Sequence, residues 1–221
     1  MARILVIDDE ESIVYTFGSF LCDEGHEILA ARNYDEGLKH ISGTDVDVVF
    51  SDIILGGKTG IDVLREVKAR GLTCPVVMIT GFPDIRTASE AVRLGAFDYV
   101  AKPVVQETLL RLTSLAVQHK RALDERERYR SHLEAIFMSV EDSIITVDKD
   151  MRVLELNGAA KELCRSCPEA IGKGGAELQV PCKESFLQAL GETLETLRSV
   201  RGRRVECQRA SVRTGNPDSE S

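Results

Sequence analysis

The stretch ILVIDDEES, residues 4–12, joins an unbroken apolar run to four consecutive carboxylates, Asp8, Asp9, Glu10 and Glu11. A short run of β-branched and aliphatic residues predicts a strand buried on both faces, which is typical of a parallel sheet. Ligands of open parallel sheets bind outside the carboxyl ends of the strands. Negative charge placed where this strand ends therefore indicates a site at that edge.

The composition is that of a globular protein and limits the possible functions. The chain has 221 residues, long enough for two small domains, with 43% apolar and 29% charged residues. A net charge of -8 argues against a nucleic-acid-binding surface over the whole chain. No apolar run is long enough to cross a bilayer and no signal-peptide pattern opens the chain. We expect a cytoplasmic protein with reduced cysteines.

Residues 1–104 alternate short apolar runs with helical periodicity. Strands are predicted at 4–7, 27–31, 46–50, 75–80 and 97–100. Apolar residues recur every three or four positions at 12–22, 34–41, 61–69 and 85–94. Because each return to a parallel strand needs a crossover, this alternation predicts a doubly wound α/β domain with a five-stranded parallel sheet.

A single long helix is predicted over residues 105–138, continuing the last helix of the first domain. Nine positions follow at spacings of three and four: Leu109, Leu112, Ala116, His119, Leu123, Arg126, Arg130, Leu133 and Phe137. A rod about 50 Å long cannot bury one stripe against a compact domain along its whole length, so a parallel copy is the expected partner. The polar middle of this seam leaves room for two registers. The alternative is that the rod is only a spacer.

The remaining residues predict a small α+β domain at 139–210 with a mainly antiparallel sheet. Strands are expected at 143–148, 151–157 and 203–210, short helices and loops at 158–175, and a helix at 183–198. The tail at 211–221 is polar and has no periodicity, so we expect it to be flexible.

Five residues should meet at the carboxyl edge of the first sheet. They are Asp8, Asp9, Asp52, Thr80 and Lys102, each at the end of a predicted strand or within two residues after it. Clustered carboxylates stay ionised only if a cation joins them, and oxygen ligands favour Mg²⁺. A carboxylate nucleophile beside a metal, an ammonium and a hydroxyl matches phosphoryl transfer.

Residues 2 to about 120 resemble the receiver domain of two-component response regulators. The resemblance rests on IDDE at 7–10, DIILGGKTG at 52–60, MITG at 78–81 and GAFDYVAKP at 95–103. It implies a flavodoxin-like fold with strand order 2-1-3-4-5, a histidine kinase as phosphoryl donor and Asp52 as the phosphoacceptor.

The resemblance also implies roles for the surrounding residues. Mg²⁺ would be held by Asp8, Asp9, Asp52 and the backbone carbonyl of Ile54. Thr80 and Tyr99 would be the switch pair, Lys102 would contact the phosphoryl group, and the Lys102–Pro103 peptide would be cis.

Two features of this chain modify the pattern. Where the family usually has a proline, four residues after the acceptor, the loop contains Gly56 and Gly57, which should make it more mobile. The side chains two positions after Asp52 and Thr80 flank the path of the hydrolytic water in receivers; here they are Ile54 and Phe82. Both are bulky and neither can orient water, so the acyl phosphate should hydrolyse slowly.

The second domain resembles the first part of a PAS sensor domain. The matching motifs are HLEAIFMSVEDSIITVDKDMRVLELNGAAKELC at 132–164 and CPEAIGK at 167–173. Receiver, connector and PAS in this order are similar to the N-terminal regulatory half of sigma-54-dependent transcriptional activators. We therefore expect a fragment of a longer protein that contacts DNA only through an absent output domain.

Other sites in the second half are interpreted as structural. Four cysteines, Cys164, Cys167, Cys182 and Cys207, could offer thiolates to a metal, but their spacing is irregular and we expect no bound cofactor there. No histidine follows His132, a linker residue, to ligate a haem. The basic cluster Arg198, Arg201, Arg203 and Arg204 lacks interleaved aromatics and is interpreted as a solvated face.

These observations predict a phosphorylation-controlled switch and not an enzyme. Phosphorylation would repack the face made by helix 4, strand 5 and helix 5, and alter a homodimer formed through that face and the linker helix. Two alternatives stay open. One is a ligand or redox sensor centred on the PAS domain, and the other is an Asp-nucleophile phosphatase of the haloacid dehalogenase type.

Overall fold

The computed structural model describes residues 1–163, 171–174 and 183–196. The chain divides into two compact units, Met1–Tyr129 and Arg130–Ser221. The predicted strand at 203–210, the tail, the four cysteines of the second half and its arginine cluster all lie outside the described residues. None of the described helices combines the length and the apolar character needed to span a membrane.

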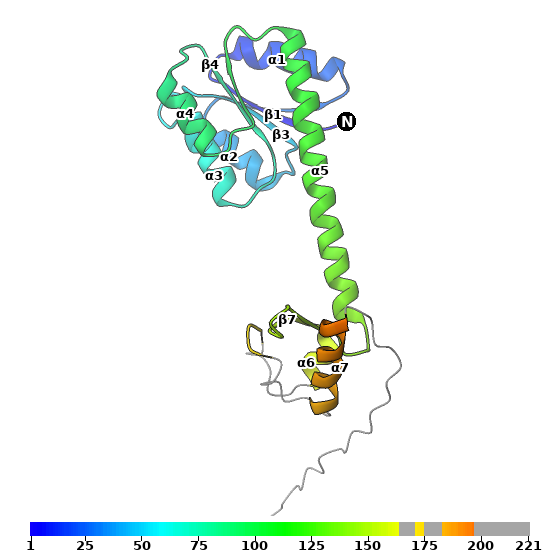
Figure 1. Cartoon of the computed structure of the whole chain (residues 1–221). Helices are drawn as coiled ribbons and strands as arrows, with labels where there is room; N and C mark the ends of the chain where they lie inside the picture. The colour runs from blue at the N-terminus through cyan, green and yellow to red at the C-terminus, as the bar shows by residue number, and fades with distance from the viewer. Residues whose placement is uncertain (164–170, 175–182, 197–221) are drawn as a thin grey trace, which may run out of the picture. The chain divides into compact units, whose positions relative to one another are not determined.

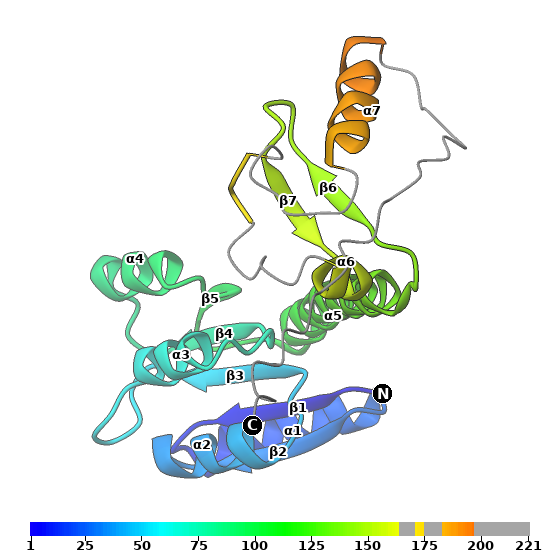
Figure 2. The ribbon, with the colours of Figure 1, turned by 90° about the horizontal axis from the view of Figure 1, so that it is seen from below.

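The first unit is built on one parallel sheet. Its strands are β1 (Arg3–Ile7), β2 (Glu27–Ala31), β3 (Val48–Asp52), β4 (Val76–Thr80) and β5 (Asp98–Ala101). Figure 2 shows them succeeding one another in the order β2-β1-β3-β4-β5. The predicted doubly wound sheet and its strand order are therefore confirmed.

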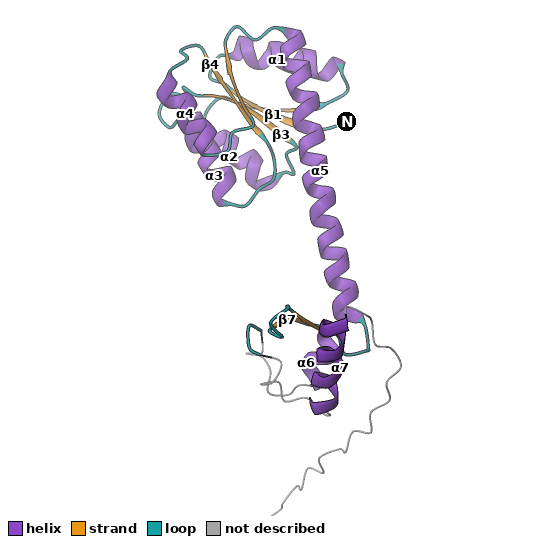
Figure 3. Cartoon of the chain, viewed as in Figure 1, coloured by secondary structure: helices purple, strands orange, loops and turns teal. Residues whose placement is uncertain are grey.

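Helices cover both faces of this sheet, as the apolar runs predicted (Figures 1 and 3). They are α1 (Glu11–Asp23), α2 (Tyr34–Gly43), α3 (Gly60–Ala69), α4 (Ile85–Arg93) and α5 (Gln106–Ser139). One core cluster joins the sheet to α2, α3 and Ala91 of α4, and a second joins it to α1 and the first part of α5. Because both faces are buried, β3 and β4 are enclosed at every position.

Strand β3 ends two residues later than the apolar run at 46–50 predicted. Ser51 and Asp52 are polar, yet both are buried and pair with Met78 and Ile79 of β4. The ladder hydrogen bonds of the neighbouring strand thus extend β3 past its apolar residues. This extension places Asp52 inside the edge of the sheet.

Helix α5 uses its first turns within its own unit. Leu109, Leu112 and Ala116, the first three positions of the predicted seam, are buried against the sheet. They are therefore not available to a partner, which corrects the expectation for this part of the seam. From 121 to 139 the helix exposes nearly every residue, with only Leu123 and Phe137 partly buried.

The second unit contains the predicted hairpin of β6 (Ile145–Val147) and β7 (Val153–Leu156), which pair antiparallel. Helix α6 (Gly158–Leu163) follows β7, and α7 (Lys183–Thr196) lies in the last described segment. The buried side chain of Asn157 links the segment before β6 to the start of α6. Its Nδ2 donates to the carbonyls of Val140 and Asp142, and its Oδ1 accepts from the amides of Ile144 and Ala160.

Candidate functional site

The carboxyl edge of the first sheet holds a compact charged cluster. Nζ of Lys102, which follows β5, lies 2.7 Å from Oδ2 of Asp52 and 2.9 Å from Oδ2 of Asp8. It also lies 2.9 Å from Oε1 of Glu10. Asp52 is the last residue of β3 and Asp8 directly follows β1. The structure thus brings together, from three strand ends, residues that the sequence predicted to meet.

Asp8 is the most enclosed of these carboxylates, with 1% of its surface exposed. Its Oδ1 accepts a hydrogen bond from the amide of Glu10 at 2.9 Å. Its buried Oδ2 is close to Lys102 but not at an angle that makes a hydrogen bond. Burial raises the pKa of the Asp8 carboxyl, and this effect is larger than the lowering of the pKa by the nearby Lys102 ammonium. Asp8 therefore has an oxygen that a further cation could satisfy.

Lys102 is the only cation that the described residues place in this cluster. Burial lowers the pKa of its ammonium group, but the close contacts of that group with the carboxylates of Asp52, Asp8 and Glu10 outweigh burial and raise the pKa above its usual value. Lys102 is therefore fully charged at neutral pH. Its amide donates to the carbonyl of Thr80 at 2.7 Å, and the following peptide to Pro103 is cis, as predicted.

Three carboxylates could hold a divalent cation. Asp8, Glu10 and Asp52 each offer an oxygen within 4.8 Å of the other two. The predicted set contained Asp9 in place of Glu10, but Asp9 is exposed and outside this group. Glu10 is the N-cap of α1, and its amide is tied to Asp8. The all-oxygen donor set fits a hard cation of the Mg²⁺ type.

The loop after β3 is held by local bonds at both of its ends. Ile54 donates its amide to Oδ1 of Asp52 at 3.1 Å and forms a bridge with Thr59. Between them, Gly56 and Gly57 adopt φ values of 62° and 141°, which side chains rarely allow. Thr59 then caps α3 in a capping box. The glycines therefore permit a tight turn beside the Asp52 carboxylate, and the role of the Ile54 carbonyl stays a prediction.

The predicted switch pair lies on neighbouring strands. Thr80 ends β4, is 1% exposed, and accepts a hydrogen bond from the amide of Phe82 at 3.1 Å. Tyr99 on β5 is half-buried, and its hydroxyl lies 3.0 Å from Oγ1 of Thr87 and 3.4 Å from the amide of Asp84. Because Asp84 is the N-cap of α4, the tyrosine ties β5 to the start of that helix.

Ile54 lies in the loop after β3 and Phe82 in the loop after β4, next to the charged cluster. Ile54 is 50% exposed and Phe82 is 79% exposed, although both side chains are apolar. Neither offers a hydrogen-bonding group to a water molecule. Their position is therefore compatible with the expected effect on hydrolysis, which stays a prediction.

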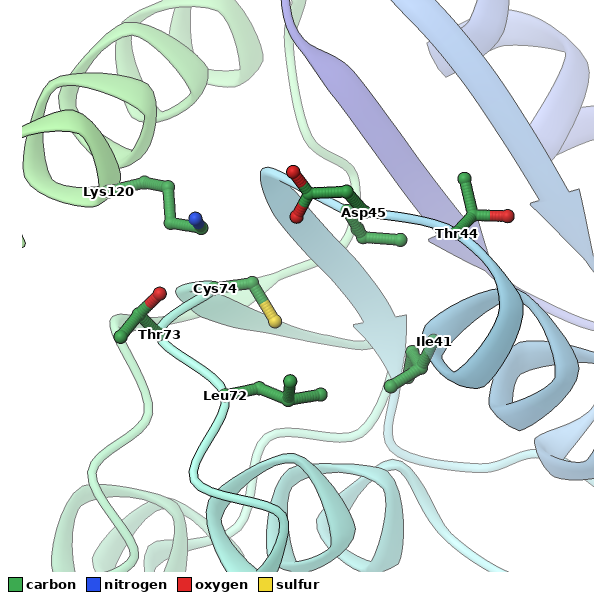
Figure 4. A pocket seen from close by; sticks show the side chains of 8 residues that line it. Ile41, Thr44, Asp45, Leu72, Thr73, Cys74 and Lys120 are labelled. Carbon is green, nitrogen blue, oxygen red and sulfur yellow. The ribbon is translucent and has the colours of Figure 1, made fainter. Parts of the chain in front are cut away.

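A small pocket lies at the opposite edge of the sheet, before β3 and β4 begin (Figure 4). It measures about 60 Å³ and is lined by residues that include Asp45, Cys74 and Lys120. Lys120 forms an ion pair with Asp124, which also accepts a hydrogen bond from Thr73 at 3.1 Å. Binding pockets for small molecules are several times larger. These contacts anchor α5 where its buried stretch ends.

Comparisons with known proteins agree with this geometry. Residues 4–114 match the family described as the response regulator receiver domain. The nitrogen assimilation regulatory protein NtrX of Azorhizobium caulinodans is 32% identical over 173 residues, covering 72% of this chain and 38% of that protein. The regulatory protein AtoC of Escherichia coli is 33% identical over 131 residues, covering 59% of this chain and 28% of that protein. The chain thus spans well under half the length of these curated relatives.

Two solved structures are each similar to a little more than half of this chain. NtrX from Brucella abortus, crystallised with ATP, is 37% identical with a TM-score of 0.53, covering 57% of this chain and 29% of that one. A receiver domain protein from Clostridium thermocellum is 35% identical with a TM-score of 0.53, covering 56% of this chain and 99% of that one.

Proposed function

Since the chain belongs to the response regulator receiver domain family, we propose that Asp52 accepts a phosphoryl group from the phosphohistidine of a sensor kinase. The observation that carries this proposal is the environment of the Asp52 carboxylate. One oxygen lies 2.7 Å from Nζ of Lys102 and the other accepts the amide of Ile54. The acceptor is thus oriented at the edge of the sheet where a phosphoryl donor can approach.

The residues around Asp52 supply the chemistry of the transfer. A carboxylate oxygen of Asp52 attacks phosphorus and the bond to the donor nitrogen breaks. Lys102 and the Thr80 hydroxyl stabilise the negative charge on the phosphoryl oxygens. Mg²⁺ would be held by Asp8, Asp52 and the Ile54 carbonyl, with Asp9 or Glu10, and would supply further neutralisation of that charge. The chain acts here as a phosphoacceptor and not as a turnover enzyme.

Phosphorylation would be transmitted through the Thr80–Tyr99 pair. Once Lys102 and Thr80 contact phosphoryl oxygens, the Phe82 amide loses its bond to the Thr80 hydroxyl. Movement of this loop frees the Tyr99 hydroxyl from the start of α4. The α4–β5–α5 face then repacks, and because α5 continues into the linker, dimer pairing changes with it.

The second unit would connect this switch to an output. We propose a PAS-like sensor fold for it, supported by the β6–β7 hairpin and α6 that follow the linker helix. The NtrX and AtoC relatives are named as regulatory proteins and are much longer than this chain. Their names support a regulatory role, and we propose that this role is in a transcriptional activator of the sigma-54-dependent class.

Incubation of the full chain with acetyl phosphate and Mg²⁺ tests the proposal. Intact-mass spectrometry should show the addition of one phosphoryl group, which Asp52→Asn abolishes and Asp23→Asn, an exposed carboxylate on α1, leaves unchanged. Peptide mapping that places the group on Asp8 would favour the phosphatase alternative instead. An absorption spectrum showing a cofactor bound to the purified chain would favour the PAS-centred sensor.

A further inference from the structure

Exposed hydrophobic side chains of α5 form an apolar stripe that differs in part from the predicted seam. Large hydrophobic side chains are exposed at Leu115 (45%), Tyr129 (58%), Leu133 (65%) and Ile136 (48%). Leu115, Tyr129 and Ile136 are separated by whole heptads, and Leu133 lies four residues after Tyr129. These residues therefore share one face of a helix that supercoils with a partner.

This stripe defines a heptad register over the linker. Its core positions are Ala122, Arg126, Tyr129, Leu133 and Ile136, all exposed in the single chain. The predicted seam instead placed Arg126 and Arg130 in the core. In the new register only Arg126 is charged, and one polar core residue is a recognised means of fixing the alignment of two helices. The register also leaves Leu109 and Ala116, which the sheet buries, outside its core positions.

The flanking charges decide between the two registers. In a parallel pair with the new register, Glu125 precedes the core position Arg126 and faces Arg130 of the second copy. The symmetric pair repeats this contact, so two ions of opposite sign flank the seam on each side. In the predicted seam the corresponding flanking positions are Ala122 and Tyr129 against Glu127 and Glu134, which offer no opposite charges. Charge complementarity therefore favours the new register.

We propose that two copies of this chain pair in parallel through Ala122, Arg126, Tyr129, Leu133 and Ile136, with Glu125 of each copy bound to Arg130 of the other. The inference deepens the dimer of the proposed function by naming its seam. Glu125 and Arg130 are exposed and form no ion pair within the described part of the chain. Both are therefore free to pair across the seam.

Charge reversal in the full chain tests this pairing by sedimentation velocity over a concentration series. Glu125→Arg and Arg130→Glu should each weaken the dimer about tenfold, because two attractions become two repulsions. The double variant should return to within about threefold of the parent dissociation constant. Glu127→Arg and Arg128→Glu make the same charge changes on the outer face and should leave dimerisation unchanged.

Three outcomes would overturn the proposal. They are a double variant that dimerises no better than either single variant, a dimer strengthened by Arg130→Leu, and a parent chain that stays monomeric with and without acetyl phosphate. Phosphorylation of Asp52, measured on the same samples, separates this result from the proposed function. If Asp52 is phosphorylated but the charge reversals leave the dimer dissociation constant unchanged, the proposed seam is wrong and the proposed function stands.

Discussion

Replacing Gly60 by alanine should damage both the stability of the first unit and its phosphorylation. Gly60 is the first residue of α3, and a Cβ built on it would lie 2.1 Å from the backbone oxygen of Asp52. It would also lie 2.8 Å from Cε of Met78 and 2.8 Å from Oγ of Ser51. The oxygen belongs to a strand paired on both sides, so no side-chain rotation can relieve the contact.

The size of the effect follows from that contact. The helix and strand must separate by about 1 Å, and such overpacking costs about 3 kcal/mol. The helix propensity of alanine offsets about 1 kcal/mol of this loss. The net destabilisation should therefore be about 2 kcal/mol, with slower phosphorylation because the Asp52 carboxylate moves away from Lys102.

Gly43→Ala provides the matched control. Gly43 ends α2, and a Cβ there would meet nothing within 4 Å, so this change should be neutral or stabilising by up to about 1 kcal/mol. Urea denaturation followed by circular dichroism, with hydrogen exchange of the β3 amides, measures both variants. A Gly60→Ala chain as stable as the parent and phosphorylated at the same rate would refute the close packing of α3 on β3.

Three further predictions concern the surroundings of the acceptor. Lys102→Met should destabilise the metal-free chain by about 2 kcal/mol, because three carboxylates lose their cation. Mg²⁺ should therefore stabilise this variant more than the parent, and equal stabilisation of the two in thermal melts would contradict this. Asp62→Ala removes the partner of Thr59 in the capping box and should cost about 1 kcal/mol at neutral pH. The bond from the Thr59 amide lowers the pKa of Asp62, so the folded state favours its ionised form. This stability is present above the ordinary pKa of 3.8 and is lost as the pH falls through the lowered value. The free energies of unfolding of the parent and of Asp62→Ala, measured by denaturation, should therefore converge at acid pH. The acyl phosphate should persist for minutes or longer because Ile54 and Phe82 cannot orient water, and loss of the added mass within seconds would refute that role.

Much of the first unit followed from local patterns. The apolar runs and the helical periodicity predicted every strand and helix of the α/β unit. A strand buried on both faces is a continuous apolar run, and a helix buried on one face has apolar residues every three or four positions. The rule that sites lie at carboxyl edges predicted that Asp8, Asp52 and Lys102 would meet. The family motifs added the cis peptide before Pro103, which no periodicity indicates.

Other features depend on contacts between segments distant in sequence. Asp9 and Glu10 are adjacent carboxylates, and only the turn into α1 decides which one reaches Lys102. The end of β3 depends on hydrogen bonds from β4, so the polar Ser51 and Asp52 were not recognised as strand residues.

The long helix shows the same division. Its length was evident from the absence of glycine and proline, but a repeat of three and four residues is compatible with neighbouring stripes on the same cylinder. Packing of Leu109 and Ala116 on the sheet assigns their stripe to the first unit. That assignment leaves the stripe through Tyr129 and Leu133 exposed. The period of a helix is a local property, whereas the face that it buries is decided by the partner against which it packs.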